Sequence, residues 1–108
     1  MNALFPNKGC KFSIKFIEPM FENAGVATLD RFLNDSGIKT NNLLNTNGLS
    51  PMLLMNVMAS WLIDHSKSGF RSAMITVDSI SGSCPTPIQS TYSASKGFMR
   101  NLTLGLAE

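Results

Sequence analysis

Cysteine and net charge are both scarce in this sequence. The two cysteines, Cys10 and Cys84, lie far apart and form no Cys-x-x-Cys pair, so we predict neither a metal site nor a disulfide framework. Reduced thiols of this kind favour a cytoplasmic location. The formal net charge is only +2, which is too small to indicate a nucleic acid or an anionic membrane as a partner.

Long apolar runs are also absent. The start, MNALFPNKGCKF, carries lysine and proline where a secretory signal needs an apolar core. The longest apolar-rich stretch, residues 52–63, is interrupted by Asn56 and Ser60 and is too short to cross a bilayer. We therefore expect no membrane segment in this chain. With 108 residues, of which 44% are hydrophobic, the chain forms at most one small globular domain.

The first twenty residues are the least regular part of the sequence. Residues 11–17 alternate apolar and polar side chains, which is a strand signal. Pro19 then interrupts, and a central strand needs the N–H that proline lacks. Two interpretations stay open: the strand is short, at residues 20–21, or the preceding segment is foreign to the fold. We therefore divide the chain into an irregular or divergent segment, residues 1–20, and a domain, residues 21–108.

Two helices and a further strand are predicted downstream. Ser36 is suited to cap a long helix over residues 37–65. A short apolar run at residues 73–77 predicts a strand, and the stretch from Ser90 to the end predicts a second helix. The apolar residues expected to pack recur mostly at helical spacing; they are Leu43, Leu44, Met52, Met55, Met58, Trp61 and Leu62 in the first helix and Phe98, Leu102, Leu104 and Leu106 in the second.

The order strand, helix, strand, helix predicts an α/β fold. It corresponds to one βαβ unit plus a helix, and such units form parallel sheets with right-handed crossovers. Ligands of these sheets bind beyond the carboxyl ends of the strands. Residues 23–25 and Ser79 follow predicted strand ends, so they would line the same rim. Gly25 permits a close approach of a ligand to the backbone, although an ordinary turn glycine is the alternative.

Pro51 lies inside the predicted long helix. Because proline has no N–H, the carbonyl of residue i−4, which is Asn47, loses its helical partner. The sequence therefore predicts a free carbonyl at Asn47 beside a kink. A plain proline kink without function is the alternative interpretation.

One group of residues carries a chemical pattern. Tyr92 and Lys96 are four residues apart in a predicted helix and would project from one face. Ser79 precedes the tyrosine by thirteen residues, at the end of an apolar run. The three side chains would be able to converge on one carbonyl oxygen, although a surface tyrosine beside a surface lysine is the usual meaning of the Tyr–Lys spacing alone.

This region resembles the short-chain dehydrogenase/reductase family. The resemblance rests on YSASK at 92–96, the serine segment 79–82, the turn Asn23-Ala24-Gly25 and Asn47, all in the family's order. It implies an α/β fold with a partial Rossmann-like parallel sheet of about two or three strands and two long helices. Only the central to C-terminal part of the family domain is matched, and the local pattern leans towards the hydroxysteroid or 3-oxoacyl-thioester reductase branch.

The resemblance also implies a reaction and its residues. The family interconverts ketones and alcohols with NAD or NADP, and a small-molecule carbonyl or alcohol would be the substrate here. Asn47, Ser79, Tyr92 and Lys96 match the catalytic positions, with the tyrosine as general acid or base. An ammonium one turn away stabilises the charged form of a phenol, and the backbone carbonyl of the asparagine holds a relay water. Asn23, Ala24 and Gly25, with Tyr92 and Lys96, match cofactor-binding positions.

The sequence also departs from the family. Glu22 stands where a second asparagine is usual, and no glycine-rich phosphate loop precedes Asn23. We therefore expect a fragment that keeps the catalytic half-site. The alternative function is a non-catalytic remnant that pairs with itself through its two long helices, as these helices form the family's dimer interface. The alternative location is the cytosolic face of the endoplasmic reticulum, for a longer anchored enzyme.

Overall fold

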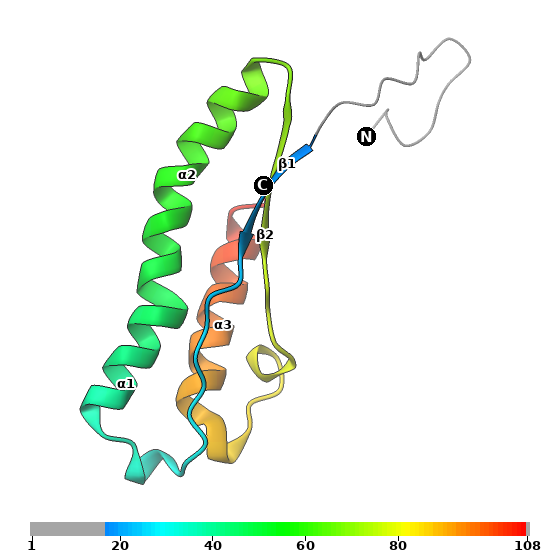
Figure 1. Ribbon diagram of the computed structural model, residues 1–108. Helices are drawn as coiled ribbons and strands as arrows, with labels where there is room; N and C mark the ends of the chain where they lie inside the picture. Colours follow the sequence, from blue (N-terminus) through cyan, green and yellow to red (C-terminus); the bar gives the residue numbers. More distant parts are fainter. Residues whose placement is uncertain (1–16, 108) are drawn as a thin grey trace.

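The computed structural model describes residues 17–107. This part of the chain forms two parallel strands and two long helices in the order strand, helix, strand, helix (Figure 1). The predicted α/β class is confirmed. No helix in this range is long and apolar enough to cross a membrane.

Strand β1 (Ile17–Glu22) pairs in parallel with strand β2 (Arg71–Thr76). Its first residue precedes Pro19, so the prediction of a strand confined to residues 20–21 is wrong. The predicted strand at residues 11–17 lies outside the described residues, except for its last position. β2 begins two residues earlier than its predicted start.

The geometry of the β1–β2 pair explains why Pro19 is tolerated. The carbonyl of Glu22 accepts a hydrogen bond from the N–H of Val77 at 2.9 Å, so the polar backbone groups of Glu22 point towards β2. Backbone groups of successive strand residues point to opposite sides, which turns those of Pro19 towards the other edge of β1. Within residues 17–107 no strand pairs with that edge, and proline is compatible with such an edge position.

The predicted long helix is present and continuous, but it contains a wider turn. It consists of α1 (Gly37–Leu44), a π-helical turn (Asn45–Leu49) and α2 (Ser50–Lys67). Ser36 caps its start as predicted, because the serine Oγ accepts the N–H of Lys39 at 3.2 Å. The helix ends two residues beyond the predicted His65.

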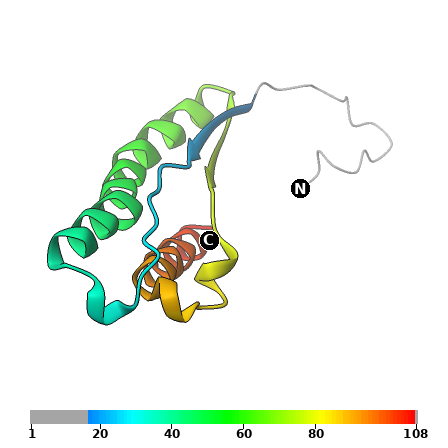
Figure 2. The same cartoon turned by 60° about the horizontal axis from the view of Figure 1, so that its bottom comes forward.

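Helix α3 (Ser90–Gly105) confirms the second predicted helix. Figures 1 and 2 show α3 beside the long helix, with the start of α1 near the start of α3. The connection from β1 to α1 is tied to this end of α3. The N–H of Asp30 donates to the carbonyl of Ile88 at 3.0 Å, and the hydroxyl of Thr91 donates to Asp35 at 2.8 Å.

The apolar core is small. In the part of the chain that the structure describes, its buried hydrophobic side chains are Leu43, Met55, Leu62 and Met99. Burying each contributes about 1.5–3 kcal/mol, so polar connections between the elements matter for a fold with so few buried apolar side chains.

Several residues predicted to pack are exposed instead. Leu44 and Trp61 are 43% and 46% exposed, and Phe98, Leu104 and Leu106 are 45% to 61% exposed. The buried positions of α3 are instead mostly small and polar: Thr91, Ser93 and Ser95, with Met99. A sheet of two strands covers only part of the surface of two long helices, so much of their apolar surface stays uncovered. Trp61 stacks on His65 with ring centroids 4.3 Å apart.

Candidate active site

The carboxyl ends of β1 and β2 lie side by side, as predicted. The parallel register pairs Glu22, the last residue of β1, with Thr76, the last residue of β2. Residues 23–25 and Ser79 therefore leave the sheet at the same rim. Asn47 of the long helix and Lys96 of α3 reach this rim through contacts with the segments that leave β1 and β2.

Asn47 fastens the first strand's exit to both helices. It is only 3% exposed. Its side-chain Oδ1 accepts the N–H of Val26 at 2.8 Å, and its Nδ2 donates to the carbonyl of Val26 at 2.7 Å. The same Nδ2 donates to the hydroxyl of Ser95 in α3 at 3.1 Å. Both amide hydrogens and Oδ1 of Asn47 are therefore engaged in structural hydrogen bonds.

The π-helical turn places Asn47 at a local change in the helix. Residues Asn45–Leu49 form this turn, and the N–H of Ser50 donates to the carbonyl of Asn45 five residues earlier. Pro51 follows and has no N–H to offer the carbonyl of Asn47. The predicted irregularity beside Asn47 is thus present as a widened turn, and π-helical turns are frequent at functional sites.

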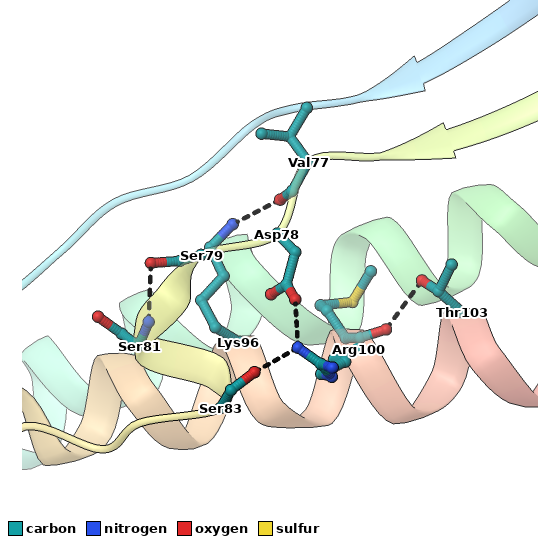
Figure 3. Close-up of polar contacts among 9 residues, drawn as sticks. Val77, Asp78, Ser79, Ser81, Ser83, Lys96, Arg100 and Thr103 are labelled. Carbon is teal, nitrogen blue, oxygen red and sulfur yellow. Dashed lines mark hydrogen bonds and ion pairs between the residues drawn. The ribbon is translucent and has the colours of Figure 1, made fainter.

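Lys96 lies between the segment that follows β1 and the segment that follows β2. Its Nζ donates to the carbonyl of Val77, just after β2, at 3.0 Å (Figure 3). A Cβ atom built on Gly25 would lie 3.9 Å from this Nζ and 3.6 Å from Oδ1 of Asn47. The structure therefore brings Gly25, Asn47 and Lys96 together. Within the described part of the chain Lys96 makes no other hydrogen bond, so two of its three ammonium hydrogens are available for other acceptors.

Tyr92 stands one helical turn before Lys96, in the first turn of α3. Its side chain is half-buried, and its backbone carbonyl accepts from the hydroxyl of Ser95 at 2.7 Å. Ser95, which is 1% exposed, thus connects Tyr92 to Asn47. Ser95 was not among the residues predicted from the sequence, although it lies between the tyrosine and the lysine.

Ser79 begins a tight turn after β2. It is the N-cap of the 3-10 turn Ile80–Gly82, and its Oγ accepts the N–H of Ser81 at 3.2 Å. Within residues 17–107 its own hydroxyl hydrogen makes no hydrogen bond, so it can donate to a ligand. Among residues 17–107, no hydrogen bond joins the hydroxyls of Ser79 and Tyr92. The predicted cofactor-binding residues Asn23 and Ala24 are exposed at the rim.

Of two cavities formed by residues 17–107 near this rim and α3, the smaller one borders the predicted catalytic residues. A very small one, of about 10 Å³, is lined by residues that include Glu22, Asn47, Thr76 and Lys96, and it has room for about one water molecule. A larger, open one of about 470 Å³ lies against another face of α3, and none of the four predicted catalytic residues lines it. The residues around the larger cavity include Ser81, Pro85, Thr86, Ser90, Ser93 and Gly97.

Comparison with solved structures identifies the fold. A 4-hydroxyisoleucine dehydrogenase complexed with NADH and succinate superposes with a TM-score of 0.72 at 22% identity, over 82% of this chain and 40% of that chain. A serine dehydrogenase from Escherichia coli gives a TM-score of 0.74 at 21% identity, over 82% of this chain and 39% of that chain.

A third similar structure, described as ElxO with NADP bound, gives a TM-score of 0.74 at 24% identity, over 83% of this chain and 35% of that chain. This chain therefore spans less than half the length of the structures that it matches. The likeness supports the predicted Rossmann-like fold.

The family model described as short chain dehydrogenase matches residues 8–108. That match covers nearly the whole chain, including both strand exits and α3. The chain belongs to the short-chain dehydrogenase family.

Proposed function

We propose that this chain carries the catalytic half of an NAD(P)-dependent oxidoreductase that interconverts a ketone and an alcohol. The observation that carries the proposal is the meeting of Gly25, Asn47 and Lys96 at the strand exits. Tyr92, whose hydroxyl has no hydrogen-bond partner within residues 17–107, stands one helical turn away.

Tyr92 is the proposed general acid and base. Its phenol gives a proton to the carbonyl oxygen during reduction and takes one from the alcohol during oxidation. Lys96 stabilises the charged phenolate through its ammonium group. Ser79 donates its free hydroxyl hydrogen to the same oxygen of the substrate, since its Oγ lone pair already accepts the N–H of Ser81.

The rim residues fit the nicotinamide end of a dinucleotide cofactor. Lys96 has two ammonium hydrogens left for ribose hydroxyls, and Gly25 leaves open the space between Lys96 and the backbone. Asn23 and Ala24 are exposed beside it. When bound, the cofactor supplies or accepts the hydride. The fit extends to this end only, because no glycine-rich phosphate loop stands before Asn23.

The proposed role of Asn47 is to hold, through its backbone carbonyl, a water molecule of the proton relay. Both of its amide hydrogens and its Oδ1 are engaged in structural hydrogen bonds, and Pro51 has no N–H to offer its carbonyl. The small cavity beside Asn47 and Lys96 has the size of one water molecule. We propose that a water there connects Lys96 to solvent, so that the proton given by Tyr92 is replaced.

The substrate proposed is a small carbonyl compound or its alcohol. The leaning towards hydroxysteroids or 3-oxoacyl thioesters remains a proposal drawn from the local sequence pattern. Either nicotinamide dinucleotide is a candidate cofactor, because one similar structure holds NADH and another holds NADP.

We also propose that the chain forms homo-oligomers through its helices. Leu53, Val57 and Trp61 recur every four residues on α2 and are 46% to 69% exposed. An apolar stripe of this kind on one face of a helix favours burial against a second copy. Light scattering at tens of micromolar protein tests this, and a well-folded monomer would contradict it.

A titration with NADH and NADPH tests the main proposal. Cofactor fluorescence and calorimetry should detect binding, and a panel of steroid, 3-oxoacyl-thioester and simple ketones should show turnover. Tyr92→Phe should abolish turnover while leaving cofactor binding measurable. Absence of binding at millimolar cofactor would overturn independent catalysis by this chain.

A further inference from the structure

The turn that carries Ser79 is tied to α3 at more than one point. Lys96 holds the carbonyl of Val77, just before this turn. Further along α3, Nη1 of Arg100 lies 3.5 Å from Oδ2 of Asp78, and it also donates a hydrogen bond to the hydroxyl of Ser83 (Figure 3).

The two contacts of Arg100 bracket the turn. Asp78 immediately precedes Ser79, and Ser83 is the C-cap of the 3-10 turn Ile80–Gly82. One guanidinium group therefore reaches both ends of the segment that presents the Ser79 hydroxyl. Arg100 comes four residues after Lys96, so both cations project from the same face of α3.

Between these two ends the backbone of the turn comes close to α3 at Gly82. A Cβ on Gly82 would lie 3.1 Å from the carbonyl carbon of Lys96, and a Cβ on Gly97 would lie 3.5 Å from the carbonyl oxygen of Gly82. Contact between glycines allows this close approach but supplies no side chain that would hold the turn against sliding along the helix. The Arg100 contacts supply that restraint.

Because the ion pair of Arg100 and Asp78 is partly exposed, its effect on the position of the turn can be distinguished from its effect on the stability of the fold. The side chains of Arg100 and Asp78 are 47% and 35% exposed, and ion pairs with such access to water add little to the stability of a fold. A residue with a small effect on stability can still have a large effect on rate, because a displacement of about 1 Å at a reacting group lowers a rate by about a hundredfold.

We propose that Arg100 is a positioning residue, which holds the Ser79 turn in register with α3 so that the Ser79 hydroxyl faces the oxygen served by Tyr92. The catalytic meaning of this inference rests on the proposed function. The positioning itself does not, because it concerns only the place of the turn on the helix.

Hydrogen exchange tests the positioning without substrate or cofactor. The N–H groups of Ser81 and Gly82 both donate to Ser79, at 3.2 and 2.9 Å. Replacing Arg100 with alanine or glutamine should raise their exchange rates by about tenfold, while amides inside α2 keep their rates. Unchanged rates at Ser81 and Gly82 in both variants would overturn the proposal, as would an equal acceleration throughout α2.

Two further sets of variants complete the test. Lys67→Ala breaks a more exposed ion pair with Asp64 at the end of α2, and it should leave the Ser81 and Gly82 exchange rates unchanged. In a chain that already carries Asp78→Asn and Ser83→Ala, the Arg100 substitution should have almost no additional effect. A full additional effect there would show that Arg100 does not act through these two residues.

Turnover measurements separate this inference from the proposed function. If the chain is active, Arg100→Gln should lower kcat by about ten- to a hundredfold and leave the KM for the cofactor unchanged. A turn that loosens in an inactive chain would support the positioning and contradict the catalytic role. An active chain whose kcat does not respond would overturn the role of Arg100 while leaving the proposed function intact.

Discussion

The side-chain amide of Asn47 pairs with the backbone of Val26 as a neighbouring strand would. Its Oδ1 accepts the N–H of Val26 at 2.8 Å, and its Nδ2 donates to the carbonyl of the same residue at 2.7 Å. The segment that leaves β1 is thereby fixed to the long helix at one residue. Gly25, which borders Lys96, immediately precedes Val26. The two hydrogen bonds between Asn47 and Val26 therefore fix the position of Gly25 at the rim.

We predict that Asn47→Ala lowers the free energy of unfolding by about 1–3 kcal/mol, since it removes the partner of both Val26 groups and leaves the buried hydroxyl of Ser95 with one bond fewer. Urea denaturation measures the change. Asn42→Ala is the matched control, because Asn42 is exposed on the same helix, and it should shift stability by less than about 0.5 kcal/mol. Equal losses in the two variants would contradict the anchor.

Removal of the Tyr92 hydroxyl should separate activity from stability. The phenol has no hydrogen-bond partner within residues 17–107, so Tyr92→Phe should change the free energy of unfolding by less than about 0.5 kcal/mol. If the proposed function holds, the same variant should lose turnover by at least about a hundredfold. A stability loss of several kcal/mol would instead indicate that the hydroxyl has a structural partner.

The sequence was sufficient to predict the elements that local signals define. Ser36 predicts the start of the long helix because an N-cap acts within its own turn. The order of strands and helices also follows from local periodicity. Pro51 was expected to kink the helix, and the observed response is the π-helical turn Asn45–Leu49, which keeps the helix continuous. The location of the irregularity was predictable from chemistry, whereas its form depends on how the neighbours pack.

Contacts between distant residues were not predictable in the same way. Asn47 and Ser95 are 48 positions apart, and Arg100 and Asp78 are 22 apart, so no short-range pattern marks either pair. The exposure of Leu44 and Trp61 was missed because helical spacing shows that a face is apolar but not what covers it. Pro19 was judged unsuitable for a strand because the number of strands beside β1 was unknown.

The carboxyl group of Asp30 provides a pH-dependent test of the connection between β1 and α1. A hydrogen bond from the side chain of Asn34 lowers the pKa of Asp30 below its usual value, with a further bond from the N–H of Arg31. Because the folded state favours the charged carboxylate, this contact stabilises the fold above the pKa of the unfolded chain. The stabilisation is lost as the pH falls through the lower, folded-state pKa.

NMR titration of the Asp30 carboxyl carbon measures this shift directly. In Asn34→Ala the titration midpoint should rise towards the usual value, but not reach it, because the N–H of Arg31 still donates to the carboxylate. Asn42→Ala is the control and should leave the midpoint unchanged. A midpoint that is the same in wild type and in Asn34→Ala would show that the amide does not bind the carboxylate in solution.

The two glycines where the Ser79 turn meets α3 should respond oppositely to the same substitution. A Cβ on Gly82 would lie 3.0 Å from Oδ1 of Asp78 and 3.1 Å from the backbone of Lys96, whereas a Cβ on Gly97 would meet only the Gly82 carbonyl, at an ordinary 3.5 Å. Gly82→Ala therefore forces the turn away from the helix, and we expect a loss of about 1–3 kcal/mol in unfolding free energy. Gly97→Ala should gain about 0.5–1 kcal/mol, since alanine is the better residue inside a helix. Thermal unfolding of both variants measures these changes. A stabilising Gly82→Ala would mean that the turn does not approach α3 closely at Gly82.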